Sequence, residues 1–230
     1  MCSSDLRLED AGMADQMVQY HLYAALHFMR DFDVYNSQQA NANWAQHDVA
    51  RISNCRVGVM GLGALGSAVA TALSNLGFAV SGWSRSMKVI DGISTYAGQE
   101  TLAEFLGQSD ILICLLPRTP ETENVLNSTT FSFLPKGAAI INAARGAMIN
   151  EADLLRALDT GHLRGAFLDV AVTEPLPKGH PFWDHAKIRI TPHIAAATRF
   201  EESVDQIADN IDRIKKGEKP RGLVDRKIGY

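Results

Sequence analysis

The feature that most constrains the fold is a glycine-rich turn between an apolar strand and a helix. Residues 61–66 read GLGALG, directly after the apolar run 57–60 and before a helical pattern that ends at Gly77. Glycines permit a tight turn, and the helix that follows offers free backbone N–H groups to a pyrophosphate. On its own such a turn is a weak signal, because many glycine-rich turns only connect elements, but its setting between strand and helix predicts a nicotinamide dinucleotide site. The residues expected at the cofactor are Gly61, Gly63, Ala64, Leu65 and Gly66.

Short apolar runs alternate with helical patterns along the rest of the chain. This alternation is typical of repeated strand-helix-strand units, which form a parallel sheet with helices on both faces. We therefore predict an α/β fold of the Rossmann type, with a doubly wound parallel sheet and an N-terminal helical arm. The expected strands are 57–60, 79–83, 111–115, 139–142, 166–170 and 188–191, with a shorter one near 94–96.

Three further segments carry helical or arm-like patterns. Apolar residues spaced three or four apart predict one long amphipathic helix over 13–32, and the Asn- and Gln-rich segment 36–48 is expected to be an exposed arm with Trp44 at its centre. A helix over 151–160 is predicted with Asn150 as its N-cap. The last helix is expected to have one apolar side, formed by Phe200, Val204, Ile207, Ile211 and Ile214.

The composition narrows the class of protein. The 230 residues are 46% hydrophobic, which suits a globular protein with a sizeable core, and the net charge of -4 implies no general attraction to nucleic acid or to acidic membranes. The longest apolar run, 111–116, is far shorter than the roughly 20 residues of a membrane-spanning helix. The 3 cysteines fit no paired disulfide framework, and the N-terminus shows no secretory signal. We expect a cytoplasmic protein with no metal site and no nucleic-acid or membrane partner.

The end of the second expected strand indicates which dinucleotide is bound. An acidic residue at this position would bind a free ribose 2′-hydroxyl, but residues 83–86 read WSRS. Arg85 can bind a 2′-phosphate through charge-assisted hydrogen bonds, and Ser84 and Ser86 add hydroxyl donors. The alternative for Arg85 is a solvated surface charge. The pattern therefore predicts NADP in preference to NAD.

Three ionisable residues, Arg145, Glu174 and His193, each follow a candidate strand, where open parallel sheets place their ligands. Reduction of a 2-keto acid requires a cation that orients the carboxylate and an acid that protonates the forming alkoxide. Arg145 and His193 match these needs, and a nearby Glu174 carboxylate would keep His193 protonated. Each residue also has an alternative role, as a surface cation, a solvated loop acid or a loop histidine.

Four short motifs resemble those of the D-isomer-specific 2-hydroxyacid dehydrogenase family. They are 142–146 (NAARG), 168–170 (LDV), 174–177 (EPLP) and 191–196 (TPHIAA). Residues 7–10, 83–86, 224–226 and 229–230 are similar to the glyoxylate/hydroxypyruvate reductase A branch of that family.

The resemblance implies specific roles. It makes Arg145, Glu174 and His193 the catalytic trio, and it implies NADPH-dependent reduction of glyoxylate or hydroxypyruvate in a homodimer formed through the nucleotide-binding domain and the N-terminal helix. Trp44 is then either near the partner's substrate pocket or an anchor of its own arm. The residues that the resemblance places beside the cofactor are Leu116, Pro117, Ala143, Arg145, Asp169 and His193.

Members of this family begin with a substrate domain of roughly a hundred residues, and the resemblance starts after it. We expect this first domain to be missing, so that NADPH binding is measurable and turnover weak. The expected division is 1–6 as a sequencing-adapter scar, 7–55 as hinge, helix and arm, 56–197 as the Rossmann domain, and 198–230 as a helix and remnant of the substrate domain. Two alternatives stay open: a dehydrogenase of another 2-hydroxy acid, and a non-catalytic cofactor-sensing protein similar to corepressors.

Overall fold

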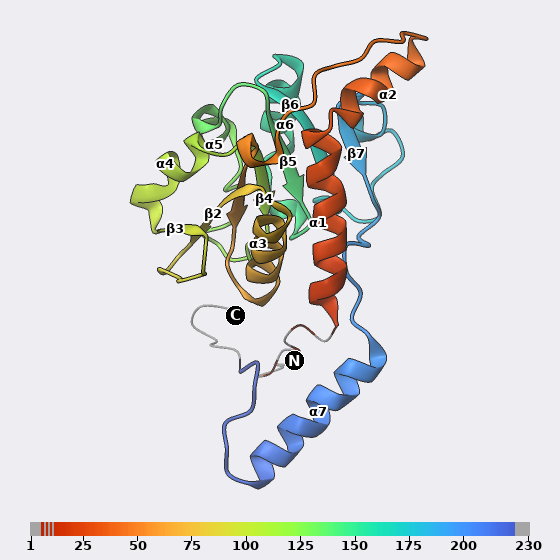
Figure 1. The fold of residues 1–230 in the computed structure, drawn as a ribbon. Coiled ribbons are helices and arrows are strands. Elements are labelled where there is room, and N and C mark those ends of the chain that lie inside the picture. The colour runs from red at the N-terminus through yellow and green to blue at the C-terminus, as the bar shows by residue number, and fades with distance from the viewer. Residues whose placement is uncertain (1–5, 7, 9, 11, 224–230) are drawn as a thin grey trace.

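A computed structural model describes residues 6, 8, 10 and 12–223. The hypothesis that 1–6 is a scar therefore falls almost wholly outside the described residues. The same is true of Arg7, Glu9 and 224–230, on which the resemblance partly rests. Figure 1 shows a twisted sheet covered by helices on both faces, with one helix standing apart from this body.

The sheet confirms the predicted Rossmann-type fold. Its seven strands follow the order β3-β2-β1-β4-β5-β6-β7, and every neighbouring pair is parallel. The strand order reverses between β1 and β4, and such a switch point opens a crevice at the carboxyl ends of the strands. The strands are β1 Arg56–Met60, β2 Ala79–Ser84, β3 Ser94–Ala97, β4 Ile111–Cys114, β5 Ala138–Asn142, β6 Leu163–Leu168 and β7 Ile188–Ile190.

Strand β6 begins and ends earlier than the predicted range 166–170. Arg164 and Gly165 interrupt the apolar pattern, yet they belong to the strand, where the Arg164 side chain reaches outward to Asp31 and Asp33. A charged residue that pairs with residues of another element can belong to a strand even though it breaks the apolar pattern of that strand. The prediction therefore placed this strand too late.

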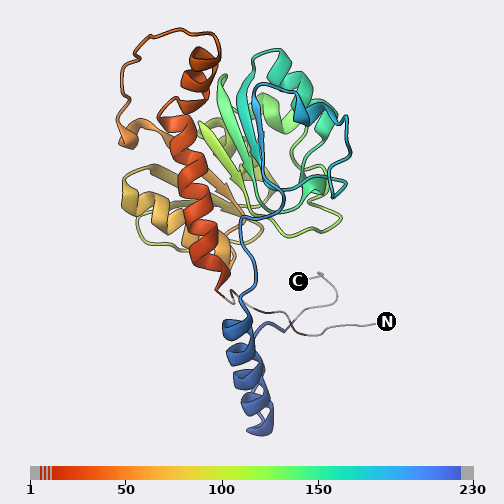
Figure 2. The ribbon, with the colours of Figure 1, turned by 90° about the vertical axis from the view of Figure 1, so that its right-hand side faces the viewer.

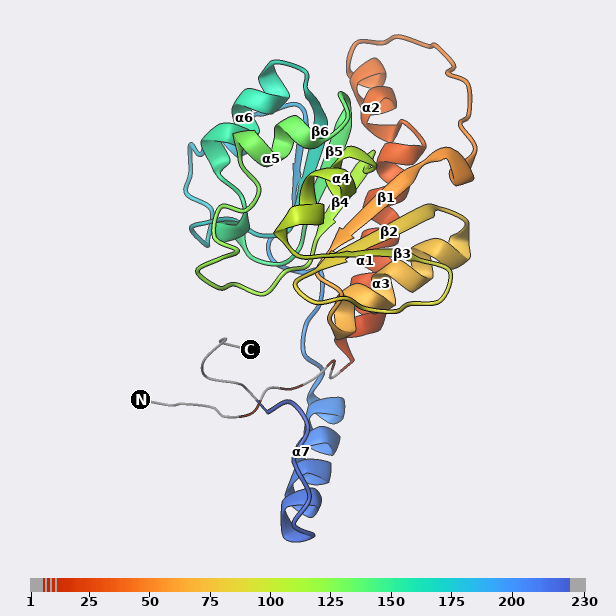
Figure 3. The ribbon, with the colours of Figure 1, turned by 90° about the vertical axis from the view of Figure 1, so that its left-hand side faces the viewer.

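Two apolar cores lie on opposite faces of the sheet. Helices α1 (Met13–Met29) and α3 (Ala64–Leu76) cover one face; in Figure 2, α1 lies in front of this face. Helices α4 (Leu102–Gly107), α5 (Ser128–Phe133) and α6 (Glu151–Asp159) cover the other, which faces the viewer in Figure 3. Alternate residues of a strand point to alternate faces, so Val57 and Val59 of β1 join the first core and Met60 joins the second. Short 3₁₀ turns occupy Ile52–Asn54, Gln99–Thr101, Gly146–Met148 and Pro181–Trp183.

The predicted helix over 13–32 is confirmed from Met13 to Met29, and the prediction is wrong only at its C-terminal end. Helix α1 ends at Met29, Asp31 takes a left-handed backbone conformation with φ 56°, and a second helix, α2 (Phe32–Ala40), starts in a new direction. The turn brings the carboxylates of Asp31 and Asp33 to Arg164, 2.5 Å from its guanidinium in each case. The arm predicted over 36–48 is exposed, but its first residues up to Ala40 are helical.

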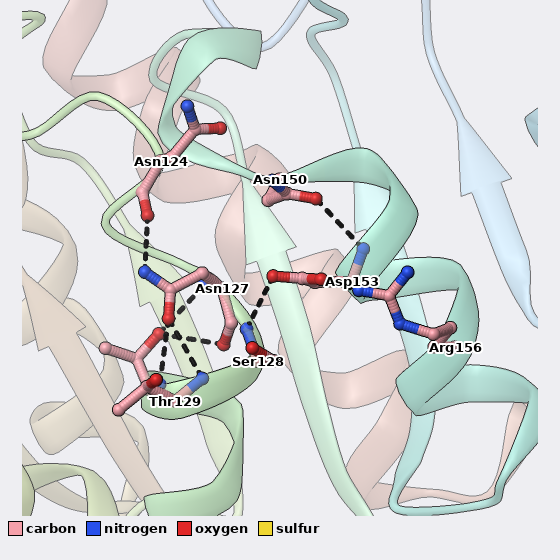
Figure 4. Close-up of polar contacts among 8 residues, drawn as sticks. Asn124, Asn127, Ser128, Thr129, Asn150, Asp153 and Arg156 are labelled. Atoms are coloured by element: carbon pink, nitrogen blue, oxygen red, sulfur yellow. Dashed lines mark hydrogen bonds and ion pairs between the residues drawn. The ribbon is translucent and has the colours of Figure 1, made fainter.

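Helices α5 and α6 begin beside each other through linked caps, as Figure 4 shows. The side chain of Asn127 accepts hydrogen bonds from the first-turn N–H groups of α5, and Asn150 accepts one from Asp153 at 3.0 Å. Asp153 in turn accepts a hydrogen bond from the Ser128 N–H at 2.8 Å. The prediction of a helix over 151–160 capped by Asn150 is confirmed. The side chain of Asn127 also donates to the carbonyl oxygen of Asn124, which ties the caps to the loop that leads to the candidate site.

The last helix, α7 (Phe200–Lys215), stands away from the sheet in all three views. Its predicted apolar side is present but exposed, from Phe200 at 82% to Val204 at 45%. Among the described residues, no helix combines the length and the apolar character needed to cross a membrane.

Candidate active site

Backbone atoms pack closely around two glycines of the turn, and open space lies beside a third. A Cβ atom on Gly66 would lie 1.8 Å from the carbonyl oxygen of Gly61, and one on Gly61, whose φ is 101°, would lie 2.6 Å from that of Leu115. Nothing lies within 4 Å of the Cβ position of Gly63. No side chain caps α3, which begins at Ala64, so its first N–H groups face this open space. The turn can therefore accept an anionic group at Gly63.

The end of β2 carries the three residues predicted to select NADP. Ser84 is buried and its hydroxyl donates to the carbonyl oxygen of Ser86 at 2.7 Å, which closes a tight turn. Arg85 and Ser86 are exposed beside this turn. In the strand order, β2 is the neighbour of β1, so the three residues lie next to the glycine turn at the same edge of the sheet.

Arg145, Glu174 and His193 come together in one pocket of about 310 Å³. They follow β5, β6 and β7 respectively, so the order of parallel strands gathers them at one edge. The Nδ1 atom of His193 lies 2.7 Å from Oε2 of Glu174. A carboxylate can only accept, so Nδ1 carries the proton and the Nε2 atom stays available, since it makes no hydrogen bond to a described residue.

Glu174 is held in its ionised form. Burial alone raises the pKa of its carboxyl. Hydrogen bonds from His193 and from the Ala171 N–H, together with the positive charges of His193 and Arg145, outweigh burial and leave the pKa below its ordinary value. The Ala171 N–H donates at 3.0 Å. Glu174 is thus a fixed negative charge behind His193 at neutral pH.

The loop that carries Arg145 is shaped by a buried amide. The side chain of Asn142 accepts a hydrogen bond from Ala144 and donates one to the carbonyl oxygen of Arg145, both at 3.1 Å. A Cβ atom on Gly146 would lie 2.0 Å from the carbonyl carbon of Ala171. This close packing joins the Arg145 loop to the loop that leads into Glu174.

His193 lies in a turn that a second carboxylate holds. Its φ is 57°, and its N–H donates to the carbonyl oxygen of Asp169 at 2.8 Å. The Asp169 side chain is 1% exposed and accepts hydrogen bonds from the Thr191 hydroxyl and from the N–H groups of Ile194 and Ala195. Asp169 therefore has an internal structural role, in addition to the place beside the cofactor that the resemblance implies.

Sequence reasoning missed one wall of the pocket. Arg118, Glu123 and Asn124 line it from the loop after β4. The guanidinium of Arg118 makes no hydrogen bond or ion pair with a described residue. A loop residue has no periodic pattern, and only its place after a strand end, the criterion that found Arg145, could have signalled Arg118. The other residues expected beside the cofactor are the buried Leu116 and Ala143 and the half-buried Pro117.

Within residues 12–223 and the few described before them, no group of three or more His, Cys, Asp or Glu side chains could hold a metal ion.

Comparison with known proteins gives consistent matches. Residues 22–195 match the NAD binding domain of the D-isomer specific 2-hydroxyacid dehydrogenases. The glyoxylate/hydroxypyruvate reductase A of Serratia proteamaculans is 49% identical over 225 residues, which are 98% of this chain and 72% of that protein. The corresponding protein of Photorhabdus laumondii is 47% identical over the same shares.

Solved structures agree. A D-isomer specific 2-hydroxyacid dehydrogenase from Xanthobacter autotrophicus, in complex with NADPH and MES, is 40% identical to this chain and superposes with a TM-score of 0.95. The match covers 98% of this chain and 93% of that one. An NADPH-dependent glyoxylate/hydroxypyruvate reductase from Sinorhizobium meliloti, in complex with NADP and sulfate, is 35% identical with a TM-score of 0.93 over 98% of this chain and 72% of that one.

Proposed function

Because the chain belongs to the D-isomer specific 2-hydroxyacid dehydrogenase family, we propose that it reduces glyoxylate or hydroxypyruvate to the D-2-hydroxy acid with NADPH. The observation that carries this proposal is the hydrogen-bonded His193–Glu174 pair in the same pocket as Arg145. The relatives named as glyoxylate/hydroxypyruvate reductases support the choice of substrate.

The residues around the glycine turn fit a dinucleotide. The open space at Gly63 and the uncapped start of α3 suit the pyrophosphate, with Gly61, Ala64, Leu65 and Gly66 forming its cradle. Arg85 and Ser86 would hold the 2′-phosphate, whereas the Ser84 hydroxyl, which donates to the Ser86 carbonyl oxygen, shapes the turn that carries them. Leu116 and Pro117 would lie beside the cofactor, and Ala143, Arg145 and Asp169 near the nicotinamide. When bound, NADPH supplies the hydride that the reduction requires.

Arg145 binds and orients the substrate carboxylate, because a guanidinium matches a carboxylate in charge and geometry. His193 donates a proton from Nε2 to the carbonyl oxygen as it gains negative charge. Glu174 accepts a hydrogen bond from the Nδ1–H of His193, which fixes the tautomer and the orientation of the ring. This assignment gives each of the three residues a separate task.

The proposal extends to the organisation of the protein. In it, 56–197 is the Rossmann domain, 7–55 the hinge, long helix and arm, and 198–230 a C-terminal helix and remnant of the substrate domain. Support for this last assignment is that α7 stands off the sheet with its apolar side exposed. A homodimer through the nucleotide-binding domain and α1, and a cytoplasmic location, complete the proposal.

A direct test measures glyoxylate- and hydroxypyruvate-dependent oxidation of NADPH by the purified chain, together with NADPH binding by fluorescence. His193→Ala should abolish turnover and leave NADPH binding close to that of the parent. His185→Ala is the matched control, since His185 pairs with Asp159 at 3.3 Å outside the pocket. Turnover that survives in His193→Ala at the level of the control would refute the acid role.

A further inference from the structure

We propose that Tyr20 and Thr191 are positioning residues, which hold the turn of His193 through a chain of hydrogen bonds that starts on α1. The inference rests on the proposed function, in which His193 is the acid. It adds a part of the protein that lies 171 residues away from that turn in sequence.

The chain of hydrogen bonds has a defined direction. The Thr191 hydroxyl lies 2.6 Å from Oδ1 of Asp169 and 2.6 Å from the Tyr20 hydroxyl. An ionised carboxylate only accepts, so the single proton of Thr191 goes to Asp169. Tyr20 must then donate to Thr191, which strengthens the donation of Thr191 to the carboxylate.

Asp169 depends on few donors. Its carboxylate is 1% exposed, and within the described chain it makes no ion pair. Its charge is balanced by the Thr191 hydroxyl and by the N–H groups of Ile194 and Ala195, each at 2.8 Å. A buried carboxylate is costly unless its oxygens are hydrogen-bonded, so the loss of one donor weakens the hold on the whole turn.

The turn needs this hold. His193 has φ 57°, a left-handed conformation that is uncommon for residues other than glycine and persists where the surroundings fix it. Asp169 binds the backbone at His193 and just after it. The Asp169 carbonyl oxygen accepts a hydrogen bond from the His193 N–H at 2.8 Å, and the Asp169 carboxylate accepts from the N–H groups of the next two residues. The direction of the His193 ring toward the pocket follows from that backbone.

Tyr20 is suited to the role because its hydroxyl stays a donor. Burial, with a smaller contribution from the charge of Asp169, raises the pKa of its phenol despite the opposing hydrogen bond to Thr191. The ring packs edge-on against Phe167, with 5.6 Å between centroids. Tyr23 provides a matched control, since its ring also packs edge-on against Phe167, at 5.8 Å, but its hydroxyl makes no hydrogen bond to a described residue.

The test compares Tyr20→Phe, Tyr23→Phe, Thr191→Val and Thr191→Ser in the full chain by amide hydrogen exchange of residues 193–195. We expect amide exchange about tenfold faster in Thr191→Val, which loses a hydrogen bond to a charged group, and roughly fivefold faster in Tyr20→Phe, which loses one to a hydroxyl. Thr191→Ser keeps the hydroxyl and should restore the parental rates, and Tyr23→Phe should match the parent. If Thr191→Val does not fold, the comparison of the two Tyr→Phe variants decides.

Kinetics give a second readout. In Tyr20→Phe and Thr191→Val, kcat should fall by a larger factor than the KM for NADPH rises, because the turn of His193 is displaced while the glycine turn and Arg85 are unchanged. Unchanged exchange at 193–195 in Tyr20→Phe, or equal effects of Tyr20→Phe and Tyr23→Phe, would overturn the positioning role. Absence of turnover in the parent would count against the proposed function and leave the exchange result to decide this inference.

Discussion

Replacement of Gly66 by alanine tests whether the glycine turn has the shape described above. The new Cβ atom would lie 1.8 Å from the Gly61 carbonyl oxygen, whereas ordinary contacts begin at 3.4 Å, so the backbone must open by about 1.6 Å. Overpacking costs about 1–3 kcal/mol, and the upper end applies because the obstacle is backbone. Alanine regains at most about 1 kcal/mol of helix propensity. The net loss of about 2 kcal/mol should lower the melting temperature by about 4–8 °C.

The same opening should weaken NADPH binding by about tenfold or more, because it moves the first N–H groups of α3 away from the pyrophosphate. Gly63→Ala is the matched control: its φ of -74° suits any residue and its Cβ meets nothing within 4 Å. This variant should melt like the parent and lose NADPH affinity only. Thermal unfolding by circular dichroism and fluorescence titration give the two quantities. A Gly66→Ala protein with parental melting and affinity would refute the geometry, and a Gly63→Ala protein with parental affinity would refute the place of the pyrophosphate.

Three further predictions concern charge. Arg85→Asp should lower NADPH affinity by about tenfold or more and raise the relative affinity for NADH, measured by titration with both cofactors, and an unchanged ratio would contradict the role of Arg85. Glu174→Gln should lower kcat by about tenfold and leave NADPH binding unchanged, because a neutral amide replaces the charged acceptor of the His193 Nδ1–H; parental turnover would contradict their coupling. Burial raises the pKa of Asp110, but hydrogen bonds from Arg56 outweigh it and leave the pKa below its ordinary 3.8. The ionised Asp110 therefore stabilises the fold fully above pH 3.8, and this stabilisation is lost as the pH falls through the lowered pKa. Asp110→Asn should therefore destabilise by about 1 kcal/mol at neutral pH, since the pair is partly exposed, and the difference should vanish in acid; equal melting at both pH values would contradict the ion pair.

Local sequence patterns predicted most of the sheet because they report burial directly. Most strands contain an apolar run, although β3 (Ser94–Ala97) does not, and the helix with both ends marked, 151–160, was placed to within a residue. The errors lie where distant partners decide. Nothing near Asp31 in the sequence indicates that it turns the chain toward Arg164, which lies 133 residues away. The same distant pairing hid the first residues of β6.

The pocket that gathers Arg145, Glu174 and His193 could be predicted because residues that follow parallel strands meet at the carboxyl ends of those strands. Its supports could not, since they depend on which atoms face each other. The chain from Tyr20 through Thr191 to Asp169 joins three elements with no common period or spacing. The pocket wall at Arg118 belongs to a loop, where sequence patterns carry little information about direction.

The close packing of Gly146 on Ala171 has a consequence for how the pocket can change. A Cβ atom on Gly146 would lie 2.0 Å from the carbonyl carbon of Ala171, so a larger residue at this position would separate the loops of Arg145 and Glu174. The wall at Arg118, Glu123 and Asn124 is exposed, so substitutions there leave the core intact. New substrate preferences can therefore arise in the loop after β4, while the joined loops of Arg145 and Glu174 stay as they are.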